Sequence, residues 1–425
     1  MKKFYFLLIA LSSMFLGGNI FAQTAKISAE LRPRFEFRNG YKTLMPDGNN
    51  AAAFISQRTR LNGFYANENF RFKLSLQDVR VWGDVKQLNK SDVNGTSVHE
   101  AWGEILFSKT FSFKVGRQEI IYDDHRIFGN VGWTQQARSH DAAIFRYNDK
   151  KHSVDLGFAY NALQESLYRV DYIGMKNYKA LQFIHYHGVF NKISLSVLEL
   201  YNGVAYDSDT AVATTAEKVA WSMTIGPRLT YKGDKVKANL TFYYQGGKNG
   251  ANVDLAATYF AGDVMFNLAK GFGLGLGFEY LSGTATNDKG NGKDKSFTPF
   301  YGTNHKFNGW MDYFYVANHL GNVGLTDIYL PIKYKHEKWL FLLIPHYFMS
   351  SATVSDANKD YSNGLGTEID LTVKYSLSKE VQLQAGYSQM LATETMQVLK
   401  GGNYQNTNNW AWVMITFKPT FFEKK

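Results

Sequence analysis

The sequence contains no cysteine among its 425 residues. Disulfides, cysteine-based zinc sites and thiol redox catalysis are therefore excluded, and an exported chain of this kind must gain its stability from extensive strand pairing or a large core. Common enzyme motifs are missing as well, because the chain has no HExxH, no P-loop and no GxSxG nucleophile elbow. We therefore expect neither an enzyme, nor a bound cofactor, nor a nucleic-acid partner.

Long apolar runs are also missing from the chain after its first residues. A transmembrane helix needs about 20 apolar residues, whereas the strongest candidate, residues 339–344, is followed directly by Pro345 and His346. Proline is scarce, at 7 residues, but Gly (37), Phe (32), Tyr (27) and Trp (8) are abundant. Aromatic residues favour strands. A β-barrel can span a membrane at a mean hydropathy of −0.30, because only alternate residues face lipid.

The first residues have the layout of a secretory signal peptide. Lys2 and Lys3 precede an apolar run at residues 4–16, and small or polar residues follow. We expect residues 1–22 to be removed and residues 23–425 to form one barrel domain; a short membrane anchor or a buried strand is the alternative. The formal net charge is +10, and this basic balance suggests anionic partners.

An alternation of period two runs along most of the chain. In residues 219–231 the odd positions are bulky and apolar, whereas the even positions are small or polar. Residues 236–245 repeat the pattern after a polar turn at 232–235. Successive side chains of a strand point to opposite faces, so such a segment fits between lipid and lumen. We predict an all-β fold, a transmembrane antiparallel β-barrel of about 18 strands. A soluble sandwich or propeller is the alternative, but no blade-length repeat of about 40–50 residues is present.

The connections between the predicted strands alternate between short and long. The short ones lie at 66–69, 108–110, 148–151, 191–192, 232–235, 268–271, 335–338 and 376–380. Between them lie mostly longer segments, at 38–53, 83–97, 118–139, 163–177, 205–217, 284–322, 351–362 and 392–408, with a shorter one at 247–252. Short periplasmic turns opposite long outer loops are typical of outer-membrane barrels, and both termini would then be periplasmic.

The inward positions of the first predicted strands carry many cations. In residues 27–37 alternate positions are apolar and should face lipid, so Arg32 and Arg34, which lie between them, should face the lumen. The same alternation places cations inward on later strands. Placing Arg80 inward requires a phase slip at residues 77–78, which we interpret as a bulge. The predicted electropositive lumen consists of Arg32, Arg34, Arg58, Arg60, Arg71, Lys73, Arg80, Arg117, Arg126, Arg138 and Arg146.

Arginine suits carboxylate or phosphate ligands, because its planar fork makes bidentate contacts and keeps its charge. As a set, these residues are therefore interpreted as a selectivity element along one wall. Acidic residues lie between them in the sequence. The predicted acidic lumen partners are Glu100, Glu104, Glu119, Asp123, Asp124 and Asp141. The alternative is that cations and anions pair with one another and hold the interior in shape.

Other polar groups give weaker signals. Residues 122–125 could supply oxygen and imidazole ligands, but a polar loop provides these by chance, and we predict no metal site. His185 and His187 share one face of a predicted strand, with no carboxylate partner evident nearby.

Several stretches resemble the alginate export family of outer-membrane porins. They are residues 115–129, 131–133, 135–136 and 138–141, the opening segments 30–36 and 56–61, and residues 300–309 with Asp312. The resemblance implies an 18-stranded monomeric barrel with an electropositive constriction that passes an anionic polysaccharide. It also implies selectivity roles for the arginines in the matching motifs, which are Arg58, Arg60, Arg117, Arg126 and Arg138. One departure is the end of the chain, since barrels usually finish on an aromatic residue and this one ends at Lys425.

Two functions remain open from the sequence. The first is a passive, anion-preferring porin for uronate-like oligosaccharides or small carboxylates, embedded in outer-membrane lipid and served by periplasmic secretion partners. The second is a structural or adhesive barrel with a plugged lumen and loops that bind a partner.

Overall fold

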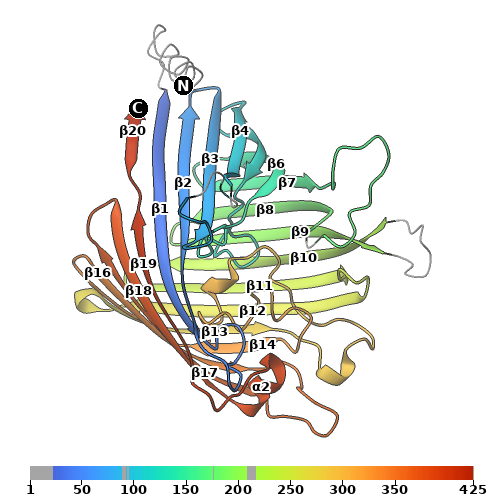
Figure 1. Cartoon of the computed structure of the whole chain (residues 1–425). Helices are drawn as coiled ribbons and strands as arrows, with labels where there is room; N and C mark the ends of the chain where they lie inside the picture. Colours follow the sequence, from blue (N-terminus) through green and yellow to red (C-terminus); the bar gives the residue numbers. More distant parts are fainter. Residues whose placement is uncertain (1–22, 89–91, 93–94, 176, 208–216, 425) are drawn as a thin grey trace.

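The sheet of this protein closes on itself. The computed structural model describes residues 23–88, 92, 95–175, 177–207 and 217–424, so the expected signal peptide lies outside the described residues. β1 (Thr24–Asn39) pairs antiparallel with β2 (Ala52–Ala66) on one side and with β19 (Asn408–Phe417) on the other. All other strands pair antiparallel with their neighbours, and together they form the barrel in Figure 1. Closure leaves no long unpaired edge in the wall, as a membrane-spanning sheet requires.

The remaining strands follow in chain order. They are β3 (Phe70–Val81), β4 (Ser97–Leu106), β5 (Phe111–Gln118), β6 (His140–Asn148), β7 (His152–Tyr160), β8 (Ala180–Phe190), β9 (Ile193–Asp207), β10 (Glu217–Lys232), β11 (Val236–Lys248), β12 (Asp254–Asn267), β13 (Phe272–Leu281), β14 (Leu325–Tyr329), β15 (Ile332–His336), β16 (Trp339–Met349), β17 (Gly364–Ser376), β18 (Val381–Ala392) and β20 (Thr420–Lys424). The described helical elements are α2 (Glu394–Lys400) and the single turns η1 (Ala269–Gly271), η2 (Thr286–Asp288) and η3 (Asn304–Lys306). No helix among the residues that the structure describes is long and apolar enough to cross a membrane.

Two barrel strands are interrupted at prolines. β14 and β15 both pair with β13 and β16, and the break between them contains Pro331. β19 and β20 both pair with β1, and Pro419 lies between them. Proline cannot donate to a strand ladder, so it ends the regular pairing at both places. Counted this way, the twenty segments form 18 barrel strands, and the predicted number is confirmed.

The alternation of short turns and long loops is also confirmed. Turns at 67–69, 107–110, 149–151, 191–192, 233–235, 337–338 and 377–380 connect strands at one end of the barrel. The longer connections leave from the other end. Thr24 pairs with Ala66 beside the first of these turns, and Lys424 pairs with Ala25, so both ends of the described chain lie at the turn end. In an outer-membrane barrel this is the periplasmic end.

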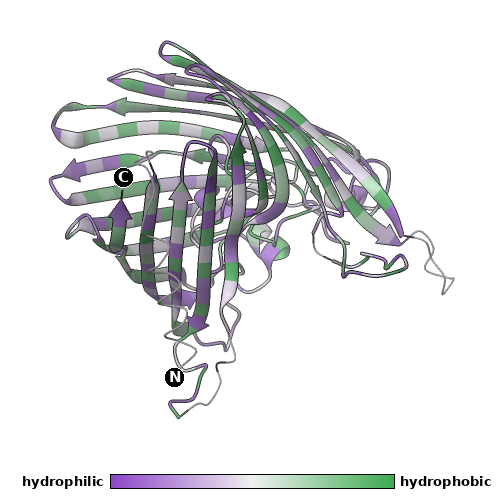
Figure 2. Cartoon of the chain, turned by 90° about the horizontal axis from the view of Figure 1, so that it is seen from above, coloured by the Kyte–Doolittle hydropathy of each residue, from purple (hydrophilic) through white to green (hydrophobic). Residues whose placement is uncertain are grey.

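The two faces of the wall differ as the alternation predicts. On β10, Ala220 and Thr224 are buried on the lumen face, whereas Trp221 and Leu229 are exposed on the outer face. Figure 2 shows the resulting bands of hydrophilic and hydrophobic residues along the strands. An exposed apolar outer face of this kind is the lipid-facing surface of a membrane barrel.

Two long loops fold into the barrel. Residues 119–139 connect β5 to β6, and residues 282–324 connect β13 to β14. Phe128 of the first loop forms a parallel bridge with Tyr301 of the second. The buried apolar cluster includes Phe128 and Tyr313 from these loops, packed with wall residues such as Phe183 and Trp410. Loops therefore occupy much of the lumen, which is not an open cylinder.

The predicted inward position of Arg80 is wrong. The register between β2 and β3 runs without a shift, so no bulge in β3 turns Arg80 toward the lumen. Arg80 lies opposite Gln57, on the phase that alternates with inward-facing Arg58. It pairs there with Asp78, Nη2 to Oδ2 2.6 Å. The register shift lies instead between β3 and β4, at residues 75–76.

Arg117 and Asp141 do not line the lumen either, contrary to the sequence prediction. Lys114 lies opposite Glu104 on the inward phase of β5, and a period of two puts a residue three positions later on the other face. Arg117 therefore shares the outward phase with exposed Val115, and Asp141 lies directly opposite it. The two side chains pair with each other, Nη2 to Oδ2 2.6 Å, on the outer surface.

Candidate functional site: a charged lumen closed by two loops

One wall of the lumen is basic and holds loop 119–139 by its carbonyl groups. Arg32 donates from Nη1 to Gly132 O at 2.7 Å and from Nη2 to Thr134 O at 3.0 Å. Arg34 donates from Nη1 to Trp133 O at 2.6 Å, and its guanidinium also stacks 4.0 Å from the centre of the Trp133 ring. These side chains are buried and lie on the inward phase of β1 as predicted, and their hydrogen bonds position the loop.

Acidic residues pair with the other cations of this wall. Glu30 accepts from Arg58 Nε at 2.8 Å, and Glu119 lies 3.8 Å from Arg60 Nη1. Nearer the periplasmic end, two further pairs join β3 and β4. These are Arg71 with Glu104, at 3.2 Å, and Lys73 with Glu100. Three predicted cations, Arg60, Arg71 and Lys73, therefore lie beside predicted anions, as the ion-pair interpretation requires.

A second part of the wall is acidic, and sequence reasoning did not identify it as part of the site. Glu279, Asp327, Glu368 and Asp370 are buried on the inward phases of β13, β14 and β17. Glu368 Oε1 accepts from the backbone N–H of Met311 at 2.8 Å. Asp370 Oδ2 accepts from the backbone N–H of Trp310, also in loop 282–324, at 3.1 Å. This wall therefore holds its loop by amide N–H groups, the reverse of the basic wall.

Arg126 joins the first loop to the acidic wall. Its side chain is fully buried, and Nη2 donates to Glu279 Oε2 at 3.0 Å and to Asn308 Oδ1 at 2.8 Å. The guanidinium lies 4.5 Å from the centre of the Phe307 ring. Arg138 also crosses to the second loop, with Nη1 donating to Gly302 O at 3.1 Å. Both predicted loop arginines therefore lie at the closure, where they connect the loops to each other and to the wall.

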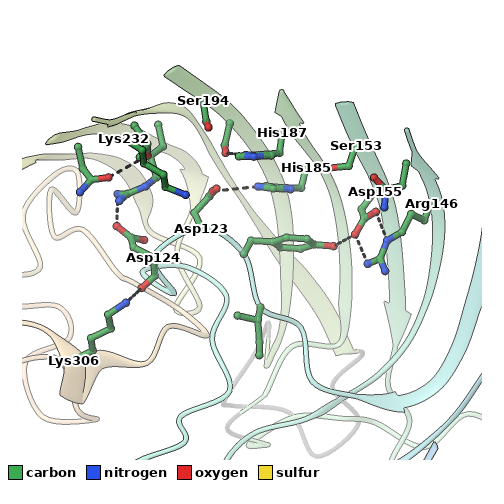
Figure 3. Close-up of a pocket in the computed structure, with 17 residues that line it drawn as sticks. Asp123, Asp124, Arg146, Ser153, Asp155, His185, His187, Ser194, Lys232 and Lys306 are labelled. Carbon is green, nitrogen blue, oxygen red and sulfur yellow. Dashed lines mark hydrogen bonds and ion pairs between the residues drawn. The ribbon is translucent and has the colours of Figure 1, made fainter. Parts of the chain in front are cut away.

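A polar cavity of about 620 Å³ lies beneath loop 119–139, and we call it the vestibule (Figure 3). Three aspartates line it, and each has a basic partner on the wall. Asp123 accepts from His185 Nε2 at 3.1 Å, so the absence of a carboxylate partner for this histidine was wrongly inferred from the sequence. Asp155 makes a bidentate pair with Arg146, at 2.7 and 2.6 Å. Burial alone would raise the pKa of Asp123, but the hydrogen bond and charge of His185, together with Ser196 and Arg228, hold the pKa below its usual value.

Asp124 completes the set of three, and its partner is Arg228 on the inward phase of β10. Sequence reasoning had not singled out Arg228. The signal was present in the alternation of residues 219–231, where this residue stands on the polar phase.

Lysines near the periplasmic turns face the lumen without acidic partners. Register places them inward, because their strand neighbours such as Tyr231 and Trp339 are exposed on the outer face. Within the part of the chain that the structure describes, none of them makes an ion pair. We call them the lysine collar: Lys232, Lys237, Lys333, Lys335 and Lys374. The set was not predicted, although the alternation itself marks these positions.

One cluster of potential metal ligands occurs among the described residues. The ligand atoms of His99, Glu100 and Glu119 lie within 4.8 Å of one another. His99 Nε2 is already hydrogen-bonded to Glu119 Oε1, at 2.7 Å, while Arg60 and Lys73 pair with the two carboxylates. Positive charge is thus already supplied by side chains, and the cluster is an extension of the basic wall's ion pairs.

A closed antiparallel barrel with an apolar outer face and a charged lumen defines an outer-membrane channel. Its fold is similar to Acinetobacter baumannii OccAB1, with TM-score 0.64, 11% identity, and 94% of this chain and 97% of that chain covered. It is also similar to a BenF-like porin from Pseudomonas fluorescens Pf-5, with TM-score 0.61, 12% identity, and 93% and 99% covered. A third is Pseudomonas aeruginosa OpdK, solved with vanillate, with TM-score 0.60, 10% identity, and 93% and 98% covered.

Within this class the chain belongs to the alginate export family, whose model matches residues 23–326. The comparison with curated proteins gives no match. The family and the fold together place the protein in the bacterial outer membrane as a porin-like transport channel.

Proposed function

We propose that this protein is a passive channel that prefers anions, with the lysine collar as the element that sets the preference. The collar lies at the periplasmic mouth, and its cations lack ion-pair partners in the described part of the chain. The arginines of the basic wall, in contrast, already bind carboxylates and loop carbonyls. Unpaired charges in a confined lumen determine which sign of ion enters, so the collar carries the proposal.

The proposed solutes are anionic saccharides, such as uronate-like oligosaccharides, or small carboxylates. The family description, alginate export, supports the first. The presence of vanillate, a carboxylate, in the OpdK structure supports the second as a class that this fold accepts. We further propose that residues 1–22 direct export, that residues 23–425 act as one monomeric domain, and that periplasmic partners deliver the solute.

Reversal potential under a salt gradient tests the preference. Changing Lys237, Lys333 and Lys335 together to Gln should bring the ratio of anion to cation permeability several-fold closer to one, because the mouth loses three unpaired positive charges. The matched control is Arg117→Gln, which removes a cation from the outer surface and should leave the ratio unchanged. An unaltered ratio in the triple variant would refute the role of the collar.

A plugged structural barrel is the second candidate, and the interlocked loops favour it. Gly129 N donates to Tyr301 O, and Thr303 N donates to His125 O, both at 2.9 Å, so the loops are joined across the lumen. Conductance in a planar bilayer distinguishes the two functions, since a permanently plugged barrel gives no current steps.

A further inference from the structure

One ion pair lies between two cavities of the lumen. Asp124 and Arg228 line the vestibule, and they also line a second cavity of about 270 Å³ further inside. Both side chains are largely buried, with 16% and 11% of their side-chain surface exposed. The two cavities share this pair in their linings, together with Asn239 and Lys306.

Three cations lie around this point. Arg228 Nη1 donates to the Asp124 carboxylate and, at 2.8 Å, to Thr241 Oγ1. Lys306 reaches the same aspartate from loop 282–324, but its Nζ donates to the backbone oxygen, at 2.8 Å, and not to the carboxylate. Lys232 lies on the same inward phase of β10 as Arg228 and also lines the vestibule. Figure 3 shows Lys306 and Lys232 on the same side of the cavity as Asp124. Arg228, Lys232 and Lys306 thus lie around the Asp124 carboxylate, while Asp123 and Asp263 also line these two cavities.

We propose that the vestibule binds one carboxylate of a sugar acid or a small organic acid, which replaces the Asp124 carboxylate on Arg228. The exchange substitutes one charge-assisted hydrogen bond for another, so the buried guanidinium is never left without an acceptor. A neutral sugar cannot make this exchange. Asp124 belongs to a loop, whereas Arg228 belongs to the barrel wall, so the carboxylate can withdraw while the guanidinium stays in place.

The remaining lining suits the rest of such a molecule. Ser153, Ser194 and Asn148 offer hydroxyl and amide groups to sugar hydroxyls. A volume of about 620 Å³ lies within the range of small-molecule sites, roughly 300–1,000 Å³. The proposal rests on the anion-preferring channel proposed above, and it names the point in the pathway where the solute charge is recognised.

Calorimetry on the purified full-length protein in detergent tests the exchange, with D-glucuronate as the probe and D-glucose as the neutral comparison. Asp124→Asn should bind glucuronate about tenfold more tightly than wild type, because the internal competitor loses its charge. Arg228→Gln should lose binding, and Lys232→Gln should weaken it several-fold. Glucose should not bind any of the proteins. The matched control is Asp141→Asn, which removes an aspartate from an arginine pair on the outer surface and should bind as wild type does.

If Asp124 and Arg228 form a purely structural ion pair, Asp124→Asn should not strengthen glucuronate binding. Unchanged or weaker glucuronate binding in Asp124→Asn would overturn the proposal, and so would full binding in Arg228→Gln. Lys232 makes no ion pair in the described residues, so Lys232→Gln keeps the test valid if a lumen variant fails to fold; undiminished binding there would also overturn it. Calorimetry measures binding without an ion current, so it distinguishes failure of this inference from failure of the proposed function. An anion-preferring channel that binds no glucuronate refutes this inference alone. Glucuronate binding without anion preference refutes the proposed function alone.

Discussion

At the scale of single residues, the most unusual charge in the outer loops is Lys400, at the end of α2. Its side chain is buried, with Nζ donating to Asn318 O at 2.9 Å and lying 5.3 Å from the centre of the Phe314 ring. No carboxylate pairs with it in the described chain. Burial lowers the pKa of Lys400 from 10.5 to about 7, because an apolar surrounding disfavours the charged form.

This burial makes the packing of α2 depend on pH. The folded pKa lies below the unfolded one, so the packing is most stable above pH 10.5 and loses stability as the pH falls toward 7, by up to about 1.4 kcal/mol per unit. Lys400→Met should remove the dependence. Hydrogen exchange of the α2 amides at pH 7 and 9, corrected for intrinsic rates, measures it. The explanation fails if the Met variant keeps the wild-type pH dependence.

The second residue-scale prediction concerns the buried pair of Arg126 and Glu279. Arg126→Met leaves the carboxylate buried without its cation and should destabilise the closure by about 3–5 kcal/mol. Adding Glu279→Gln should restore much of the lost stability of the closure, because no unpaired charge then remains. Trypsin cleavage within loop 119–139 reports the opening, and the double variant serves as its control. Equal cleavage in the single and double variants would contradict the role of charge.

Which residues face the lumen could be predicted from alternation wherever the phase was unbroken. Arg32, Arg34 and Arg58 are inward for this reason. Arg80 and Arg117 were assigned against the phase of their own strands, and both lie on the outer face. Partners across the lumen could not be predicted, because contacts such as Arg126 with Glu279 join positions 153 residues apart in the chain.

At the scale of elements, one aromatic side chain of loop 119–139 adds to the hydrogen bonds that hold this loop. Trp133 stacks on His305 at 4.5 Å between ring centres, and it meets Trp410 and Trp412 edge-on. Trp133→Ala should cost about 3–5 kcal/mol in loop docking, as for other large aromatic truncations. A loosened loop widens the pathway, so single-channel conductance should rise and become noisier.

The control for this change is Trp82→Ala, because Trp82 is 56% exposed at the rim of the barrel. Its conductance should match wild type. If Trp133→Ala gives wild-type conductance and noise, the loop is held by its backbone hydrogen bonds alone.

Strands and connections were predictable because alternation and turn chemistry are local signals. The inward folding of loops 119–139 and 282–324 was not, since it depends on complementary groups from strands far apart in the sequence. The final extension shows the same limit. The terminal aromatic position that barrels usually show is occupied by Phe417 at the end of β19, and β20 adds a further segment to β1 beyond Pro419. The sequence does not show that this extension pairs with β1, so it could not be distinguished from an irregular tail.

At the scale of the whole molecule, charge is distributed unevenly across the lumen and along its axis. The basic wall and the acidic wall both lie at the level of the loops. The cations of the basic wall largely pair with carboxylates, and each wall holds its loop through backbone groups. Net positive charge without partners remains at the periplasmic mouth, in the lysine collar. The two walls therefore position the closure, while the mouth acts on ions in solution.

This distribution predicts how the anion preference responds to salt. Charges in water are screened over about 10 Å at 0.1 M salt and about 3 Å at 1 M. The collar lysines Lys333 and Lys335 are exposed, so the preference should weaken steadily as symmetric background salt rises between these concentrations. Reversal potentials at a fixed gradient ratio measure it. A preference set by the buried ion pairs of the walls would be screened far less, so a ratio that stays constant up to 1 M would move the selectivity element from the mouth to the loop closure.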